Sequence, residues 1–386
     1  MSQAIQLELH GDVDARFSDV AETFLAGFDT GRDVGAALAV LVDGAMVADV
    51  WAGHVDRRRQ HPWQRDTLCC LFSATKGVTA LCLLQAVAEG RVALNDPVAA
   101  YWPEFGVHGK SDITVRHLLN HQAGMVGFHE PVDADLLYDW NATCEALAEE
   151  RPWWPPGSKH GYHARTFGYL LGEVLRRGTG WLVGEWLERN VAGPLDLDLH
   201  IGLHVRDLDR CAQMLPARVR AGQNDVPESA REMMRDFRDL STPTGAAFQN
   251  PSLGPGYMNS TRFRAAEMPA ANGHGTARGL ATLYANVPRL LPAELLAEAT
   301  TTESLGMDEV LKSVSHFGLG FMLHHPEAPI GIRPGTFGHA GAGGSMAFCD
   351  PGARLAFCFV MNQMQQGVVT GGMSAMRCAE SVYDCL

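Results

Sequence analysis

The chain has 386 residues, of which 46% are hydrophobic and 19% are charged. This length predicts two domains, or one domain with a large insertion, and it allows a sizeable core. The 44 acidic and 31 basic residues give a formal net charge of −13, so a partner bound through its phosphates, nucleic acid above all, is not expected.

The first ninety residues predict a helix, a β-hairpin and a second helix, in that order. Residues 13–31 carry apolar side chains at helical spacing and end in a glycine. Residues 34–53 contain two β-rich runs on either side of Asp43-Gly44, which is a strong signal for a hairpin. Residues 73–90 are mostly apolar and stop at a glycine, which predicts a buried helix.

The middle of the chain is richer in helix. Residues 115–121 and 166–178 predict helices because apolar side chains recur at helical spacing. Residues 205–272 carry several prolines and glycines and are expected to be loop-like. We expect the part from 205 to 260 to shape the substrate pocket.

The carboxyl-terminal part returns to β-structure. Helix resumes near residue 273, a strand is predicted at 317–324, and a hairpin surrounds the turn at 350–352. A last helix is predicted at 371–386. Strands at both ends of the chain with helices between them predict one antiparallel sheet built from the two termini.

These elements define the expected fold. It belongs to the α/β class, of the α+β type, with an antiparallel β-sheet flanked by helices and an inserted, mostly helical domain. The sheet domain would be discontinuous and consist of residues 1–80 and 273–386. The helical domain, with long loops, would consist of residues 81–272.

The strongest chemical pattern is Ser73-Ala74-Thr75-Lys76, at the start of the helix predicted at 73–90. A spacing of three residues puts Ser73 and Lys76 on one helix face, which suits a nucleophile beside its base. Burial and the positive end of the helix both disfavour the ammonium form of Lys76. The chain has only four lysines, so the match is informative. A helix cap followed by a surface lysine is the alternative.

Two further segments carry candidate chemistry. Tyr162 lies on a Gly- and Pro-rich connection before a predicted helix and could project into a cleft, where a cationic neighbour would ease ionisation of its phenol. A packed aromatic residue with a hydrogen-bonded hydroxyl is the alternative. Residues 338–344 are rich in glycine and precede a predicted strand, so their free amide N–H groups could bind an oxyanion. A plain strand-entry loop is the alternative.

The three elements occur in the order Ser73/Lys76, Tyr162 and His339-Ala340-Gly341. This order resembles the serine hydrolases of the penicillin-binding-protein and class C β-lactamase fold, whose marks are S-x-x-K, Y-x-N and K-T-G. Segments such as DTLCCLFSATKG, ITVRHLLNHQAG and HAGAGGSMAFCDP are more similar to the family VIII carboxylesterases. The resemblance covers roughly residues 34–386. It implies a β-lactamase/transpeptidase-like architecture, with the site in a cleft between sheet and helical domain.

The resemblance also implies roles for individual residues. Ser73 would be the acylated nucleophile, Lys76 and Tyr162 the proton-transfer pair, and the backbone N–H groups of Ser73 and Ala342 the oxyanion hole. His339 would orient the substrate or form a hydrogen bond with Tyr162. The other substrate-binding candidates are Ala340, Gly341, Phe128 and Trp154. The side chains that could line an acyl pocket are those of Phe128 and Trp154, and also those of Met125 and Trp153. Core packing is an equally good interpretation of these four.

Two departures from the β-lactamase pattern favour an esterase. Ala164 stands two residues after Tyr162, where β-lactamases have an asparagine that binds the substrate's amide side chain. His339 stands where they have a lysine, and the loss of a permanent cation weakens recognition of a substrate carboxylate. No G-x-S-x-G motif is present, which argues against an α/β-hydrolase.

The sequence thus predicts a serine carboxylesterase that hydrolyses short-chain or small-molecule esters through an acyl-enzyme. A β-lactamase, a D-amino-acid peptidase, a transacylase and a non-catalytic binding protein remain as alternatives. No cofactor is expected, and no metal, because the histidines and cysteines lack zinc-ligand spacing.

The location is predicted from the cysteines and the amino terminus. No basic stretch followed by an apolar one begins the chain, and no run of about 18 apolar residues occurs in it, so neither a secretory signal nor a membrane helix is expected. The nine cysteines lie mostly among apolar neighbours, which predicts reduced, buried thiols and a cytoplasmic protein. The oligomeric state is not predicted.

Overall fold

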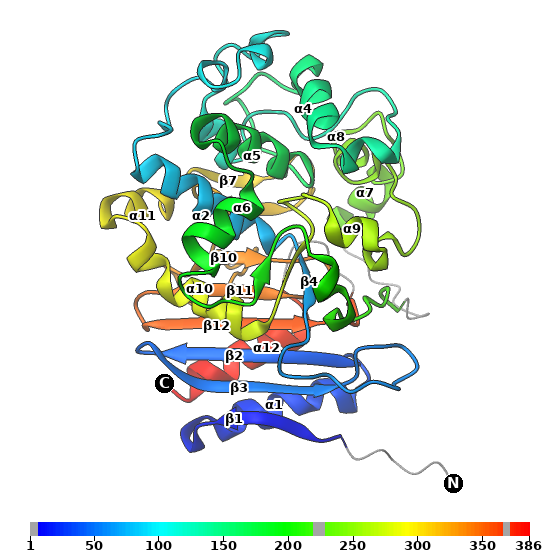
Figure 1. Ribbon diagram of the computed structural model, residues 1–386, viewed down its shortest axis with the longest axis vertical. Helices are drawn as coiled ribbons and strands as arrows, with labels where there is room; N and C mark the ends of the chain where they lie inside the picture. Colours follow the sequence, from blue (N-terminus) through cyan, green and yellow to red (C-terminus); the bar gives the residue numbers. More distant parts are fainter. Residues whose placement is uncertain (1–6, 219–227, 366–370) are drawn as a thin grey trace.

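The computed structural model describes residues 7–218, 228–365 and 371–386. Its main feature is a nine-stranded antiparallel sheet in the order β1-β3-β2-β12-β11-β10-β9-β8-β7 (Figure 1). The strands are β1 (Leu9–Val13), β2 (Gly35–Val42), β3 (Ala45–Gly53), β7 (Ser304–Met307), β8 (Val314–Phe317), β9 (Met322–Leu323), β10 (Phe337–Ala340), β11 (Met346–Asp350) and β12 (Leu355–Met361). Because β2 pairs with β12, the two ends of the chain meet in one sheet, as predicted.

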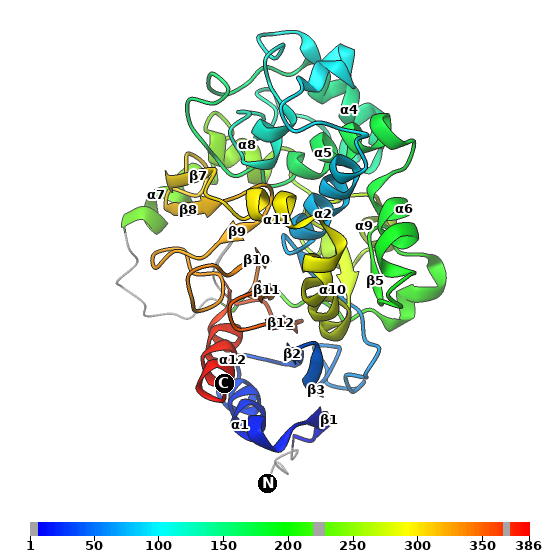
Figure 2. The ribbon, with the colours of Figure 1, turned by 90° about the vertical axis from the view of Figure 1, so that its left-hand side faces the viewer.

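The centre of the sheet is buried on both faces. Along β2, Leu38 and Val40 belong to one core cluster, and Ala39 and Leu41 to the other, because successive side chains of a strand point to opposite faces. Helices α1 (Ser18–Asp29) and α12 (Met373–Asp384) cover the first face, and α10 (Ala277–Leu290) covers the second (Figure 2). These three helices and the hairpins β2–β3 and β11–β12 confirm the predicted elements, whereas β1 was not predicted.

A second, three-stranded sheet has the order β4-β6-β5. It is formed by β4 (Cys69–Phe72), β5 (Leu199–His200) and β6 (Gly273–Gly275). The chain runs from β4 through Ser73 directly into α2 (Thr75–Ala88), which is buried over most of its length, as predicted.

The other helices lie mainly in the middle of the chain, in the upper part of Figure 1. They are α3 (Val115–Leu119), α4 (Trp140–Glu149), α5 (Thr166–Thr179), α6 (Val183–Leu187), α7 (Glu228–Asp236), α8 (Pro243–Gln249), α9 (Thr261–Ala265) and α11 (Ala293–Ala299). Shorter helical turns occur at Ala15–Phe17, Val98–Ala100, Pro103–Gly106, Ala134–Tyr138, Glu188–Ala192, Val205–Arg210 and Tyr257–Asn259. The predicted boundary between residues 80 and 81 falls inside α2, and the division into two domains stays a prediction.

The expectation of loops throughout residues 205–272 is wrong for the helices α7, α8 and α9. The start signals of two of them are present but stand among prolines and glycines. Thr242 caps α8 by accepting a hydrogen bond from the Gly245 N–H at 3.1 Å, and Ser260 caps α9 by accepting one from the Phe263 N–H at 3.1 Å. Residues 219–227 of this stretch lie outside the described part of the chain.

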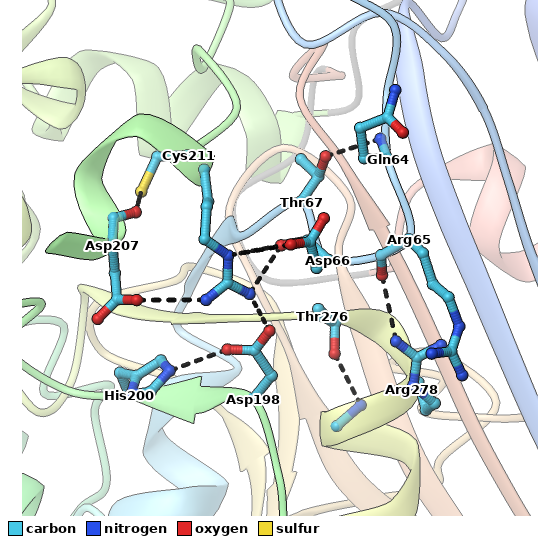
Figure 3. A network of polar contacts seen from close by, with 12 residues as sticks. Gln64, Arg65, Asp66, Thr67, Asp198, His200, Asp207, Cys211, Thr276 and Arg278 are labelled. Carbon is cyan, nitrogen blue, oxygen red and sulfur yellow. Dashed lines mark hydrogen bonds and ion pairs between the residues drawn. The ribbon is translucent and has the colours of Figure 1, made fainter.

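A network of charged side chains ties the segment before β4 to its surroundings (Figure 3). Arg210 forms ion pairs with Asp198 and with Asp207, and it also donates to the Asp66 carbonyl at 2.9 Å. The Leu68 N–H donates to the Arg210 carbonyl at 2.9 Å. The network therefore fixes the path of the chain just before the strand that leads to Ser73.

Two further expectations concern the whole chain. All nine cysteines are free and seven of them are buried, as the sequence predicted. Among the described residues, no helix is both long and apolar enough to cross a membrane.

Candidate active site

Ser73 lies at the junction between β4 and α2, where the backbone is strained. Phe72, directly before it, has a φ of +47°, a left-handed conformation that a bulky side chain rarely adopts. Thr75 secures this turn, because its hydroxyl donates to the Phe72 carbonyl at 2.5 Å and accepts from the Gly273 N–H at 2.9 Å. Ser73 remains partly exposed, whereas Lys76 is fully buried.

Lys76 lies on the same helix face as Ser73, as its spacing predicted. Its Nζ atom is 3.3 Å from Ser73 Oγ, 2.7 Å from the Ala164 carbonyl oxygen and 2.9 Å from the Ala270 carbonyl oxygen. A neutral amine has two N–H donors and one lone pair. The two carbonyl groups can accept both donors, which leaves the lone pair for the Ser73 hydroxyl. The alternative of a surface lysine is wrong.

The surroundings of Lys76 favour its neutral form. Burial holds the pKa of Lys76 well below its usual range, and the positive charge of Arg165 lowers it further. Among the described residues, no carboxylate forms an ion pair with Lys76. An amine whose neutral form is favoured can accept a proton more readily, so this environment suits a general base.

Tyr162 lies beside this pair. The Lys76 Nζ atom is 4.6 Å from the centre of the Tyr162 ring, and the Tyr162 hydroxyl is buried without a hydrogen bond of standard geometry to a described residue. Burial raises the pKa of Tyr162, while Ser73 lowers it and Asp308 raises it by smaller amounts. Burial is the largest of these effects, so the net shift is opposite to an eased ionisation of the phenol.

His339 is fully buried and lies in β10, so residues 338–340 form a strand and the expectation that this stretch only precedes a strand is wrong for them. Its ring centre is 6.2 Å from that of Tyr162, and its Nδ1 atom lies 2.7 Å from the Ala340 carbonyl oxygen. Its Nε2 atom has no hydrogen-bond partner among the described residues, so the expected bond to Tyr162 is not formed. Burial lowers the pKa of His339 to about 3, so the ring is neutral.

The turn between β10 and β11 lies against β4. A Cβ atom on Gly341 would come within 2.2 Å of the Leu71 carbonyl oxygen, and Ser345 Oγ donates to that carbonyl at 3.1 Å. Ala342 and Ser73 are both partly exposed, and the backbone N–H of neither donates to a described residue. Two free amide groups therefore flank the place where β4 meets this turn.

The remaining substrate-binding candidates lie at different depths in the molecule. Ala340 is fully buried in β10. Trp154 packs against Gly161, directly before Tyr162, and belongs to the same core cluster as Tyr162. Phe128 belongs to the other core cluster. Their assignment to substrate binding stays a prediction.

Two groups beside Tyr162 were not predicted from the sequence. His121 packs on the Tyr162 ring with 5.1 Å between ring centres, and its Nδ1 atom accepts a hydrogen bond from the His163 N–H at 3.2 Å. Asp308, far along the chain, accepts a hydrogen bond from the Tyr162 N–H at 3.0 Å. No local pattern marks either residue. Within the described ranges, no group of three His, Cys, Asp or Glu side chains could hold a metal ion.

Comparison with known proteins shows to which family the chain belongs. The sequence profile of the beta-lactamase family matches residues 20–373. The esterase/beta-lactamase LipL of Mycobacterium tuberculosis is 35% identical over 374 residues, which cover 93% of this chain and 84% of LipL. The esterase EstB of Burkholderia gladioli is 27% identical over 383 residues, which cover 91% of each chain.

Two solved structures are similar over nearly their whole length. A family VIII carboxylesterase is 36% identical, with a TM-score of 0.88, and the match covers 98% of this chain and 100% of the other. A penicillin-binding protein homolog from Caulobacter crescentus is also 36% identical, with a TM-score of 0.89 and the same coverage. These matches confirm both the resemblance and the fold class predicted from the sequence. The chain belongs to the beta-lactamase family.

Proposed function

We propose that this protein is a serine carboxylesterase that hydrolyses short-chain or small-molecule esters through an acyl-enzyme on Ser73. One observation carries the proposal. The buried Lys76 amine has carbonyl acceptors for its two N–H groups, and its third contact is Ser73 Oγ at 3.3 Å. The relatives named esterases, LipL and EstB, and the family VIII carboxylesterase of similar structure support the same reaction class.

In the first step, Ser73 Oγ attacks the ester carbonyl while its proton passes to the Lys76 amine. The tetrahedral oxyanion accepts hydrogen bonds from the Ser73 and Ala342 N–H groups. Tyr162 donates its phenol proton to the departing alkoxide, and the Lys76 ammonium restores that proton. The C–O bond to the alcohol breaks, and the products are the acyl-enzyme and a neutral alcohol.

In the second step, water attacks the acyl carbonyl. Its proton passes through Tyr162 to Lys76, and Ser73 recovers a proton as the carboxylic acid leaves. The raised pKa of Tyr162 suits this relay, because a phenol that keeps its proton at rest can give it up only as another arrives. The Tyr162 hydroxyl and the His339 Nε2 atom have no hydrogen-bond partner in the described part of the chain, and here the leaving group or the water becomes their partner.

The same site suits a neutral ester better than a β-lactam. His339 is uncharged, so it supplies no cation for a substrate carboxylate at this position. Ala164 has no side-chain amide for a β-lactam's acylamino group, and its backbone carbonyl is already an acceptor for Lys76. Both features favour substrates without these groups.

We also propose a cytoplasmic location and a small-molecule ester as substrate, with no nucleic-acid or membrane partner. The nine free thiols, most of them buried, fit a reducing compartment.

The test compares the wild-type protein with Ser73→Ala on 4-nitrophenyl butyrate and on nitrocefin. We expect ester turnover to exceed nitrocefin turnover, and Ser73→Ala to lose about a thousandfold or more in kcat. Intact-mass measurement during turnover should detect one acyl group, and digestion should place it on the peptide that contains Ser73.

Ser158→Ala is a matched control, because Ser158 is an exposed serine close to Tyr162 in the sequence whose hydroxyl donates only to the Pro155 carbonyl. This variant should keep wild-type turnover. Near wild-type hydrolysis by Ser73→Ala would contradict the proposal. Formation of a new ester when an alcohol is added, at the expense of the acid, would instead indicate a transacylase.

A further inference from the structure

Asp308 is a fully buried carboxylate in the turn between β7 and β8, and the proposed reaction does not use it directly. Its Oδ1 atom accepts hydrogen bonds from the Tyr162 N–H at 3.0 Å, the Val310 N–H at 2.8 Å and the Leu311 N–H at 2.9 Å. Its Oδ2 atom accepts one from the Ser315 hydroxyl at 3.0 Å. Burial raises the pKa of Asp308, and its backbone donors and His160 oppose that shift. All four contacts are donors, which matches a carboxylate rather than a carboxylic acid.

The same turn holds the loop before Tyr162 through further contacts. The Glu309 N–H donates to the His160 carbonyl at 3.1 Å, and the His160 Nε2 atom lies 2.9 Å from Ser315 Oγ. The Lys159 ammonium forms an ion pair with Glu309 at 2.9 Å. Hydrogen bonds therefore hold the backbone to this turn at two positions, at His160 and at Tyr162, and Asp308 accepts the bond at Tyr162.

The charge of Asp308 meets no opposite charge from a lysine or arginine within the described residues. The titratable groups around it are His160 and Tyr162 on the loop, and Glu309 on its own turn. Around the Tyr162 ring lie Lys76 from α2, His121 from the segment after α3, and His339 from β10. A negative charge with only dipoles to balance it acts strongly on neighbours in a buried site.

We propose that Asp308 is a positioning residue for Tyr162: its carboxylate fixes the main chain at Tyr162, and its negative charge keeps the shared proton of the Lys76–Tyr162 pair in place. This inference rests on the proposed function. It assigns two effects to one side chain. The hydrogen bonds fix where the phenol lies, and the charge sets the pH range in which the pair can accept a proton from Ser73.

Asp308→Asn separates the two effects. The amide oxygen can still accept from the three N–H groups, and the amide nitrogen can donate to Ser315 Oγ, so the fold should be retained. The negative charge is lost, and a nearby pair of proton-binding groups then releases its protons at lower pH. We expect both limbs of the pH profile of kcat/KM to move to lower pH by about half a unit or more, with KM little changed.

Glu309→Gln is the matched control. It removes the same charge from the adjacent residue, but the Glu309 carboxylate is one-third exposed and already paired with Lys159. Its pH profile should coincide with that of the wild type. A role for Asp308 in stability alone would lower the melting temperature of Asp308→Asn and leave the profile in place, and that result would overturn the proposal.

Ser315→Ala gives an independent test if Asp308→Asn does not fold. It removes a donor that stabilises the charged form of Asp308, so the pKa of this buried carboxyl rises further and less of it is ionised. The profile should therefore move to lower pH, in the same direction as for Asp308→Asn, and a profile that stays in place or moves to higher pH would contradict the proposal. Ser73→Ala in the same ester assay distinguishes failure of the proposed function from failure of the role of Asp308. If Ser73→Ala remains active, the proposed function fails. If Ser73→Ala is inactive and the pH profile of Asp308→Asn is unchanged, only the role of Asp308 is overturned.

Discussion

Two polar clusters of this protein differ in whether their charged side chains form ion pairs. In the network before β4, the Arg210 guanidinium meets the carboxylates of Asp198 and Asp207, and every one of these side chains reaches solvent to some extent (Figure 3). In the site, Lys76 and Asp308 are fully buried, and among the described residues neither forms an ion pair with a side chain of opposite charge.

The difference separates a structural role from a chemical one. A charged group that is paired and partly exposed stays ionised over a wide pH range, and its ion pair fixes the local geometry. An unpaired group in a buried site has a shifted proton affinity, and it can hold or release a proton during a reaction. The paired network holds the segment that leads into β4, and the unpaired groups lie where β4 ends, around Ser73.

The sharpest way to break this comparison is to remove the unpaired amine. Lys76→Met keeps the length and burial of the side chain and removes its lone pair. We expect kcat for an ester substrate to fall by about a thousandfold or more, because Ser73 loses its proton acceptor. The melting temperature should fall as well, because the buried Ala164 and Ala270 carbonyl groups lose their donor, so kcat is measured well below it.

Kinetics of the purified variant and its thermal unfolding give both readouts. Lys110→Met is a useful control, because Lys110 is also buried and donates to the Ala148 carbonyl at 2.9 Å, but it lies away from Ser73. Lys110→Met should keep the wild-type kcat. Retention of more than a tenth of the activity by Lys76→Met would mean that another group is the base.

The paired network should show the reverse behaviour. Arg210→Gln removes the cation that joins Asp198 and Asp207, while Arg206 still lies 3.6 Å from Asp207, and we expect a loss of about 1–2 kcal/mol in the free energy of unfolding. Because the network contacts no group of the proposed reaction, kcat measured well below the melting temperature should stay within about threefold of wild type. Denaturant unfolding and ester kinetics on the same preparation test this. A collapse of kcat at unchanged stability would remove the distinction between the two clusters.

Much of the fold could be predicted because its signals are local. The turns at Asp43-Gly44 and at Asp350–Gly352 lie between β-rich runs, and both become hairpins of the large sheet. Strands at both ends of the chain predicted one shared sheet, and the pairing of β2 with β12 joins them. Short helices within 205–272 were missed, because their caps stand among residues that also favour loops.

The site was predictable only in part. Ser73 and Lys76 are neighbours on one helix, so their spacing places them together. The contact between Tyr162 and Asp308 joins positions 146 residues apart, and a single buried aspartate has no pattern of its own. The direction of the Tyr162 pKa shift also depends on burial, which only the packed structure provides.

Two buried histidines extend the comparison of the two clusters. His274 lies near the Arg210 network, and His339 lies beside Tyr162. His274 in β6 is buried, and burial lowers its pKa to about 3, a shift that Arg264 and His200 increase and the Asn272 carbonyl opposes. The unfolded chain binds a proton at this imidazole below a pH of about 6.5, so between that pH and about 3 protons favour unfolding. Its contribution to stability is therefore present above pH 6.5 and decreases as the pH falls. From pH 7 to pH 5 the loss from this residue is about 1.5–2 kcal/mol.

We expect His274→Asn to lower stability at pH 7 and to unfold with a smaller difference between pH 7 and pH 5 than the wild type, while kcat at pH 7 is unchanged. The same substitution at the exposed His108 should leave that difference as in the wild type. Denaturant unfolding at the two pH values measures it. Since His339 is also neutral and buried but lies beside Tyr162, His339→Asn should reduce the pH difference in the same way and lower kcat as well. If kcat falls equally in both variants, or in neither, then proximity to Ser73 does not distinguish these two buried histidines, and the comparison fails.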